Sequence, residues 1–296
     1  IRWTTKCNLL YWRVTEMKLT DFKQSNVHKS ILYGPPKSGK TAAVGLLAKH
    51  YNLIWFDGEG GVTTLLNPDL KLTADNLAHV ELVQTKDLPH LPLYAELCNE
   101  VVKWKTISAC NEHGKLNCPL CKKNNQEFTT IDFSTLDDSY IVVFDSLTQL
   151  SNSVMNMCKI ARGVLASKLS DTKAEWDDYG KQGAWLDNFL SAIQNAPFNV
   201  IVISHEQGIE QEDGTEKLQP VGGTRNFSRN VPRYFDHVIR CEVKNKKHIG
   251  ASSTLYSGKV LAGSRTGVVT EKFEDASESI LRLIYNRYTN YNKGTD

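Results

Sequence analysis

The chain has 296 residues, of which 41% are hydrophobic, 23% charged and 9% aromatic, and its formal net charge is +2. This composition excludes general disorder, collagen and coiled-coil architectures, and the near balance of charge neither requires nor excludes a nucleic-acid partner. No apolar run approaches the ~18 residues that a membrane span needs, so we expect a soluble protein without a membrane partner. Seven cysteines without a signal peptide favour a reducing, cytoplasmic location over a disulfide framework.

The chain begins at Ile1, and Met17 would be a natural start. We therefore expect residues 1–16 to be a non-native or disordered leader. The expected single domain covers residues 17–290, and residues 291–296 are expected to form a tail.

Short apolar runs alternate with segments of helical periodicity along this domain. The predicted strands are 30–33, 53–56, 80–83, 140–144 and 198–203. The predicted helices are 40–50, 93–107, 147–165 and 184–193. After residue 234 the pattern changes to two strands, 235–243 and 253–261, and a last helix near 277–285. Continuous apolar strands separated by helices predict an α/β fold, with a mainly parallel sheet covered by helices on both faces and a β-rich C-terminal extension of the same sheet.

Two polar stretches interrupt this alternation, at residues 108–135 and 206–233. Loops this long in a compact domain are usually functional or disordered. Both stretches are therefore candidate functional segments.

A phosphate-binding loop stands between the first predicted strand and the first predicted helix. Eight consecutive residues match the pattern G-x-x-x-x-G-K-[ST] in full: Gly34, Pro35, Pro36, Lys37, Ser38, Gly39, Lys40 and Thr41. The glycines let successive backbone N–H groups face a phosphate, and the helix N-terminus adds its positive dipole end. Lys40 supplies a charge to the β- and γ-phosphates, and Thr41 offers a hydroxyl to Mg²⁺. The loop predicts a nucleoside triphosphate site.

Three further side chains follow predicted strands at the edge where ligands bind in α/β sheets. Asp145 predicts the second Mg²⁺ anchor, although an Asp at this place also commonly caps the following helix. Glu59 could orient or deprotonate the attacking water, and the alternative is a solvated turn residue. His205 could contact the γ-phosphate, and the alternative is a surface histidine.

The first polar stretch carries Cys110, His113, Cys118 and Cys121, which form a C-x2-H and a C-x2-C pair. Soft ligands at this spacing match a tetrahedral Zn²⁺ site, and a short polar loop would need a metal to fold. We predict an inserted structural zinc loop over residues 108–125. A reduced C-x-x-C pair beside an unrelated Cys and His, and a catalytic dithiol, stay open as alternatives.

The segments GPPKSGKT, FDGEGG, VVFDS and VIVISHE occur in an order that resembles the RecA-like ATPase group. An asparagine-lysine motif of the kind that selects GTP lacks its downstream Asp here. The resemblance implies ATP as the nucleotide, Glu59 as the catalytic base and His205 as the γ-phosphate sensor. Relatives often reach a neighbouring subunit's nucleotide with a pair of basic residues, and only Arg265 is basic at the matching place. Arg265 either acts alone as this trans finger or is a hairpin arginine in solvent.

The chain more closely resembles the phage Sak-type single-strand-annealing ATPases, over roughly residues 17–285. This resemblance implies single-stranded DNA, a homo-oligomeric ring or filament, an accompanying single-strand-binding protein and the cytosol of the host cell. In RecA-like proteins the segment after the sensor strand lines the DNA path, which corresponds here to residues 206–233. The candidate DNA contacts are Lys217, Arg225, Phe227 and Arg229. A disordered surface loop is the alternative.

The leading functional hypothesis is a DNA-dependent, Mg²⁺-dependent ATPase that acts on single-stranded DNA in phage-type recombination, by annealing or strand exchange. A minimal ring helicase or helicase loader is the second hypothesis. A nucleotide-gated regulatory module that binds a protein partner is the third.

Overall fold

The computed structural model describes residues 27–88, 91–212, 214–245, 247–251 and 260–265. The expected leader, the tail, the last helix near 277–285 and most of the expected strand 253–261 lie outside the described residues.

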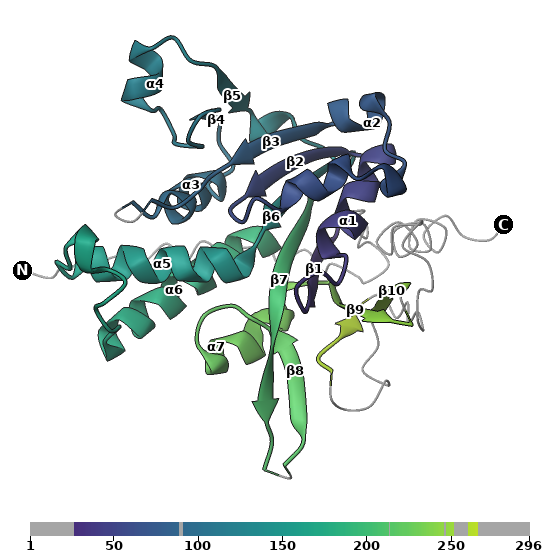
Figure 1. Ribbon diagram of the computed structural model, residues 1–296, viewed down its shortest axis with the longest axis vertical. Helices are drawn as coiled ribbons and strands as arrows, with labels where there is room; N and C mark the ends of the chain where they lie inside the picture. The colour runs from purple at the N-terminus through teal and green to yellow at the C-terminus, as the bar shows by residue number, and fades with distance from the viewer. Residues whose placement is uncertain (1–26, 89–90, 213, 246, 252–259, 266–296) are drawn as a thin grey trace, which may run out of the picture.

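One large sheet runs through the molecule (Figure 1). Its strands are β1 (Lys29–Gly34), β2 (Asn52–Asp57), β3 (Val80–Gln84), β6 (Tyr140–Asp145), β7 (Asn199–Glu210), β8 (Glu216–Pro220), β9 (His237–Lys244), β10 (Lys247–Ala251) and β11 (Gly263–Ser264). The order across the sheet is β10-β9-β1-β7-β6-β2-β3, with β8 added to β7 and β11 to β9. The strands from β9 to β3 in this order are parallel, whereas β8, β10 and β11 are antiparallel to their neighbours. The predicted C-terminal extension of the sheet is therefore confirmed.

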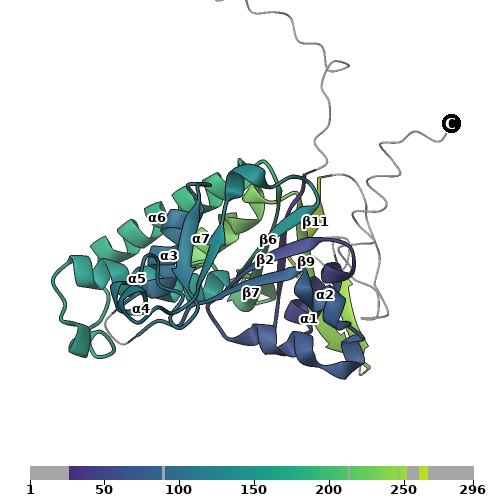
Figure 2. The same cartoon turned by 90° about the horizontal axis from the view of Figure 1, so that it is seen from above.

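Helices cover both faces of this sheet (Figure 2). The α-helices of the described residues are α1 (Lys40–Gly45), α2 (Ala74–Ala78), α3 (Leu93–Val101), α4 (Pro119–Lys123), α5 (Leu147–Ala161), α6 (Trp176–Gln194) and α7 (Arg225–Asn230). Helices α3, α5 and α6 lie on one face, and α1 and α2 lie on the other. Side chains alternate between two cores along each central strand: Val142 and Phe144 of β6 enter one, and Ile141 and Val143 enter the other. This arrangement confirms the predicted α/β fold with a mainly parallel sheet.

The predicted helix 93–107 is wrong in its second half. Helix α3 ends at Val101, Trp104 has a positive φ of 52°, and Ile107–Cys110 forms strand β4. Strand β4 pairs with β5 (Phe128–Ile131) in a small two-stranded sheet. The helical periodicity misled because strand formation depends on a cross-strand partner about 20 residues away, which local periodicity does not reveal.

The prediction that residues 206–233 form a long loop is wrong, because most of this stretch is regular structure. Strand β7 continues unbroken to Glu210 and turns back into β8, so the two strands form an arm that projects from the sheet (Figure 1). Helix α7 and the 3-10 turn Val231–Tyr234 then return the chain to β9. None of the helices in the described part of the chain has the length and apolarity of a membrane-spanning segment.

Candidate active site

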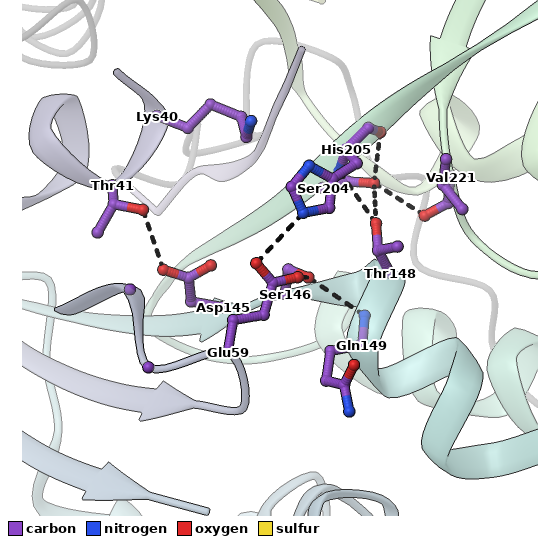
Figure 3. A network of polar contacts seen from close by, with 12 residues as sticks. Lys40, Thr41, Glu59, Asp145, Ser146, Thr148, Gln149, Ser204, His205 and Val221 are labelled. Carbon is purple, nitrogen blue, oxygen red and sulfur yellow. Dashed lines mark hydrogen bonds and ion pairs between the residues drawn. The ribbon is translucent and has the colours of Figure 1, made fainter. Parts of the chain in front are cut away.

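Four neighbouring strands deliver the predicted nucleotide site to the carboxyl edge of the sheet. The strand order β1-β7-β6-β2 sets the phosphate loop beside His205, and His205 beside the end of β6. Gly34 is opposite His205 in the β1–β7 pair, and Asp57 is opposite Asp145 in the β2–β6 pair. Residues far apart in sequence therefore meet in one cluster (Figure 3).

The phosphate loop depends on its two glycines. Gly39 has a φ of 87°, in the left-handed region that favours glycine, and a Cβ on Gly34 would lie 2.0 Å from the carbonyl oxygen of Cys241. The ammonium of Lys40 is buried in the loop and donates to the carbonyl oxygens of Gly34 (2.9 Å) and Pro35 (2.8 Å). Burial lowers the pKa of Lys40, and the nearby carboxylates, Asp145 and Glu59 among them, oppose this shift.

Thr41 and Asp145 form the pair of oxygens expected at a Mg²⁺ site. The Thr41 hydroxyl donates to Asp145 Oδ2 at 3.2 Å, and Asp145 is only 2% exposed. Burial, followed by repulsion from Asp57 and Glu59, raises the pKa of Asp145 to about 7. Hydroxyl and carboxylate oxygens are hard ligands of the kind that Mg²⁺ prefers, so the donor set fits this ion.

The turn that carries Glu59 is organised by the buried carboxylate of Asp57. This carboxylate accepts hydrogen bonds from the backbone N–H groups of Glu59 (2.9 Å), Gly60 (2.7 Å) and Val62 (3.2 Å). Asp and Asn side chains commonly close turns in this way. The sequence FDGEGG therefore indicates a turn-closing role for Asp57, which we did not predict.

Glu59 and His205 lie in direct contact, as Figure 3 shows. The Nε2 atom of His205 lies 3.2 Å from Glu59 Oε2, and the Ser146 hydroxyl donates to the other carboxylate oxygen. Burial by itself would raise the pKa of Glu59, but the hydrogen bonds to His205 and Ser146, together with the charge of Lys40, hold the pKa below its ordinary value. Glu59 is therefore ionised at neutral pH and has the protonation state of a base.

His205 is anchored on its backbone side as well. Its N–H donates to the hydroxyl of Thr148 at 3.0 Å, and its Nδ1 atom is buried without a hydrogen-bond partner among the described residues. The Glu59 and His205 side chains are 29% and 30% exposed. Such partial burial in one cluster does not fit a solvated turn residue and a free surface histidine.

These groups line a cleft of about 670 Å³, which is the usual size for a small-ligand site. The cleft is also lined by cationic and polar residues that the sequence analysis did not assign, among them Lys49, Lys71 and His248. They belong to no motif, and only the fold brings them to the cleft.

The four predicted zinc ligands come together on the β4–β5 hairpin and α4. Their ligand atoms all lie within 4.8 Å of one another, and the three cysteines are buried. His113 Nδ1 lies 3.2 Å from the sulfur of Cys121 and 3.7 Å from that of Cys110. All cysteines in the described residues are free thiols. The cluster can therefore hold a metal ion.

The candidate DNA contacts are spread over the arm and α7. Arg225 and Arg229 are exposed on α7, Lys217 is half-buried on β8, and Phe227 is half-buried against the main core. Stacking of Phe227 on a base would have to compete with this packing. The role of all four in DNA binding stays a prediction.

Arg265 lies away from the cleft. It follows β11, which pairs with the beginning of β9, and its guanidinium donates to the Arg233 carbonyl oxygen at 2.6 Å and lies 3.6 Å from Asp236. Parallel β1 carries the phosphate loop at the opposite end, so Arg265 does not serve the nucleotide of its own chain. Its role at a neighbouring subunit's nucleotide stays a prediction.

Comparison with known proteins gives a family for this chain. A family model described as an AAA domain matches residues 27–272. No curated protein matches the chain. One similar solved structure is described as a prototypical ATPase from the type III secretion system of pathogenic bacteria, with 14% sequence identity and a TM-score of 0.42. The match covers 74% of this chain and 52% of that one, so the chain spans about half the length of that ATPase.

So distant a structural likeness carries no functional information, and none of these matches tests the resemblance to Sak-type ATPases. The family match, by contrast, covers most of the chain and includes the phosphate loop, Glu59, Asp145 and His205. The chain therefore belongs to the family described as an AAA domain, and its parallel sheet with the phosphate loop after β1 is the fold of a P-loop NTPase.

Proposed function

We propose that the protein hydrolyses ATP with Glu59 as the base that activates the attacking water, and that it does so on single-stranded DNA. The observation that carries this proposal is the contact between Glu59 and His205, which joins the candidate base to the candidate γ-phosphate sensor. A carboxylate at the strand edge, ionised and hydrogen-bonded, suits proton abstraction from water.

Each group around the phosphates then has one task. The loop's N–H groups and Lys40 bind the β- and γ-phosphates, and Lys40 exchanges its bonds to the loop carbonyls for bonds to phosphate oxygens. Thr41 and Asp145 would hold Mg²⁺, which supplies charge neutralisation for the triphosphate. His205 donates to the γ-phosphate or to Glu59, and loss of the γ-phosphate changes which of the two it contacts.

Hydrogen bonds near His205 support a connection between nucleotide and DNA. The N–H of Val221 donates to the His205 carbonyl oxygen at 2.9 Å, and the Ser204 hydroxyl donates to the Val221 carbonyl oxygen at 2.8 Å. Val221 stands between the β7–β8 arm and α7, so a movement of His205 passes to the element that carries Arg225 and Arg229. These exposed guanidinium groups would bind the phosphates of the DNA backbone.

The finer biological role follows from the resemblance to Sak-type ATPases. We propose that the protein assembles as a homo-oligomer on single-stranded DNA and promotes annealing or strand exchange in recombination. A ring helicase or loader, and a module that binds a protein partner, are outcomes that the experiment below separates from this role.

We also propose that the cysteine cluster holds one structural Zn²⁺. In a tetrahedral site with Zn–S of about 2.3 Å and Zn–N of about 2.0–2.1 Å, neighbouring ligand atoms lie roughly 3.5–3.8 Å apart. The separations of 3.2 and 3.7 Å between His113 and two of the sulfurs are close to this range. Four protein ligands leave no open position, so the metal is structural rather than catalytic.

The proposal is tested by ATP turnover and DNA affinity measured with and without single-stranded DNA, at several salt concentrations. We expect DNA to raise turnover and salt to weaken binding. Replacing Arg225 and Arg229 together by Ala should reduce DNA affinity. The salt dependence of binding should weaken by the contribution of about two phosphate contacts, while turnover without DNA is unchanged.

A matched variant, Lys122→Ala with Lys123→Ala on α4, removes two charges from the zinc hairpin instead. If this variant loses DNA affinity and the arginine variant does not, the DNA lies on the hairpin. Strand unwinding by the wild type would favour the helicase, and turnover that ignores DNA would favour the protein-binding module.

A further inference from the structure

The candidate metal loop packs against the end of strand β3 with unusual closeness. Gly114, the residue after the candidate ligand His113, has a φ of 62°, and a Cβ there would lie 2.2 Å from the Thr85 hydroxyl and 2.4 Å from the Gln84 carbonyl oxygen. Thr85 is 1% exposed, and its hydroxyl donates to the Gly114 carbonyl oxygen at 3.3 Å. Only a glycine backbone in this conformation allows the two segments to approach so closely.

The same Thr85 contacts the segment that carries the candidate catalytic base. Its backbone N–H donates to the Asp57 carbonyl oxygen at 2.8 Å. The Gln84 amide lies 3.5 Å from Asp57 Oδ2, on the carboxylate that binds the N–H groups of Glu59 and Gly60. Asp57 is also opposite Gln84 in the β2–β3 pair. Contacts therefore run without a gap from Gly114 through Thr85 to the turn of Glu59.

The conformation of Gly114 depends on the candidate ligands. Its N–H donates to the Cys110 carbonyl oxygen at 2.9 Å, and the Cys110 N–H donates to the Lys115 carbonyl oxygen at 3.1 Å, so Gly114 belongs to a turn closed by a ligand residue. The cluster of buried side chains here consists of Cys110, Cys118 and Cys121, and among the described residues Phe128 is the apolar side chain that packs against them. The main core holds the two ends of this turn, where Ala109 and Leu116 pack on it, so a bound metal would chiefly stabilise the segment between them, which carries His113 and Gly114.

We propose that a metal ion in this cluster positions the catalytic turn through Gly114 and Thr85, so that zinc controls the rate of ATP hydrolysis. Thr85 is then a positioning residue, which acts through Asp57 on Glu59. This inference rests on the proposed function for the rate and on the zinc assignment for the metal. Its structural part, the effect of the metal on the turn, is measured without any ATP.

Amide hydrogen exchange tests this structural part on the full chain. The reporters are the N–H groups of Glu59, Gly60 and Val62, which the Asp57 carboxylate binds. Wild-type protein loaded with Zn²⁺ is compared with Cys118→Ser, and Cys158→Ser on α5 serves as the control for a buried cysteine outside the cluster. We expect faster exchange at the reporters in Cys118→Ser alone.

Thr85→Val keeps the metal but removes the hydroxyl, so it should also speed exchange at the reporters, and Thr85→Ser should restore protection. In turnover assays, Cys118→Ser and Thr85→Val should both lower kcat on the order of tenfold or more, with the KM for ATP unchanged, because a displaced catalytic group affects the chemical step.

Wild-type protein that binds no Zn²⁺ would overturn the inference. Unchanged reporter exchange in a Cys118→Ser protein that has lost its metal would overturn it as well, as would a Thr85→Val protein with wild-type exchange. If the wild type shows no ATP turnover but its reporters respond to zinc, the proposed function fails while the metal's effect on the turn stands.

Discussion

Glu59 is held by contacts to its carboxylate and by contacts to its backbone. His205 and Ser146 bind its two oxygens, and Asp57 holds the backbone on which it stands. The hydrogen bonds keep Glu59 ionised in spite of its partial burial. A base must be both placed and deprotonated, and here separate residues meet the two requirements.

Replacing Glu59 by Gln should separate ATP binding from hydrolysis. The amide keeps the size of the side chain and a hydrogen bond to His205 but cannot accept a proton from water. We expect turnover to fall by about 10²- to 10⁴-fold, the usual contribution of a general base, with little change in ATP affinity. Single-turnover hydrolysis and equilibrium nucleotide binding measure the two effects, and Glu96→Gln on the exposed side of α3 is the matched control. Wild-type turnover in Glu59→Gln would remove Glu59 from the mechanism.

The raised pKa of Asp145 predicts that Mg²⁺ binding depends on pH near neutrality. Because Asp145 holds a proton below about pH 7, Mg²⁺ must displace that proton, and affinity should fall by up to about tenfold per pH unit below this value. Asp145→Asn has no such proton and should show a flatter dependence. Titration of Mg²⁺ into both proteins between pH 5.5 and about pH 8.5, a range that brackets the raised pKa, makes the comparison.

The raised pKa of Asp145 also predicts that the stability of the fold changes with pH in the opposite direction to the Mg²⁺ affinity. The folded state binds the Asp145 proton more tightly than the unfolded state, so the free energy of unfolding should fall as the pH rises from about 4 to about 7. An Asp145→Asn protein lacks this contribution. Equal pH slopes for the two proteins would contradict the raised pKa.

At the scale of the elements, the local sequence was a good guide to the central strands and a poor one to the insertions. Strands β1, β2, β6 and the first half of β7 lie where apolar runs predicted them, because strands buried on both faces need continuous apolar sequence. The edge strand β3 is also where its apolar residues predicted it, although only Val83 of this strand is buried. Helix α6 starts eight residues earlier than the predicted 184, since Glu175 and Asp178 form a capping box that the apolar periodicity does not include.

Two ion pairs that involve carboxylates of α6 should differ in how much they stabilise the fold. Arg162 at the end of α5 donates to both oxygens of Asp178, whose side chain is fully buried, at 3.2 and 3.1 Å. Lys181 and Asp177 form a pair at 2.6 Å in which both side chains are exposed. A buried carboxylate left without its partner is costly, whereas an exposed pair contributes little.

Arg162→Ala should therefore lower the Tm by several degrees, and Lys181→Ala should leave it nearly unchanged. Thermal unfolding followed by circular dichroism measures both variants under the same conditions. Equal Tm values for the two would show that the Arg162–Asp178 pair contributes no more to stability than the exposed pair does.

For the whole molecule, the parallel direction of the neighbouring strands β1 and β9 places the nucleotide cleft and Arg265 at opposite ends of these strands. The cleft lies at the carboxyl end of β1, and Arg265 lies beside the beginning of β9. A subunit in a ring or filament would present these two ends to different neighbours. Arg265 can then serve a nucleotide only if that nucleotide belongs to another chain.

Mixing two inactive variants tests this arrangement. Glu59→Gln lacks the base but keeps Arg265, and Arg265→Ala lacks the arginine but keeps the base. If Arg265 acts in trans, a mixed oligomer contains sites with both groups, and its turnover should exceed the sum for the separate variants. A mixture that shows only this sum would leave Arg265 with its local bonds to Arg233 and Asp236.

The sequence by itself determined the fold class, the phosphate loop and the three strand-end residues of the cleft, Glu59, Asp145 and His205. Those features depend on local pattern: glycines at fixed spacing, apolar runs of strand length, and polar residues where the runs end. Only the tertiary structure decided that Glu59 contacts His205, that 206–233 is an arm and a helix, and that Gly114 packs on Thr85. Each of these contacts joins segments dozens of residues apart, or depends on a partner strand, so its geometry follows from strand order and packing, which local sequence pattern does not contain.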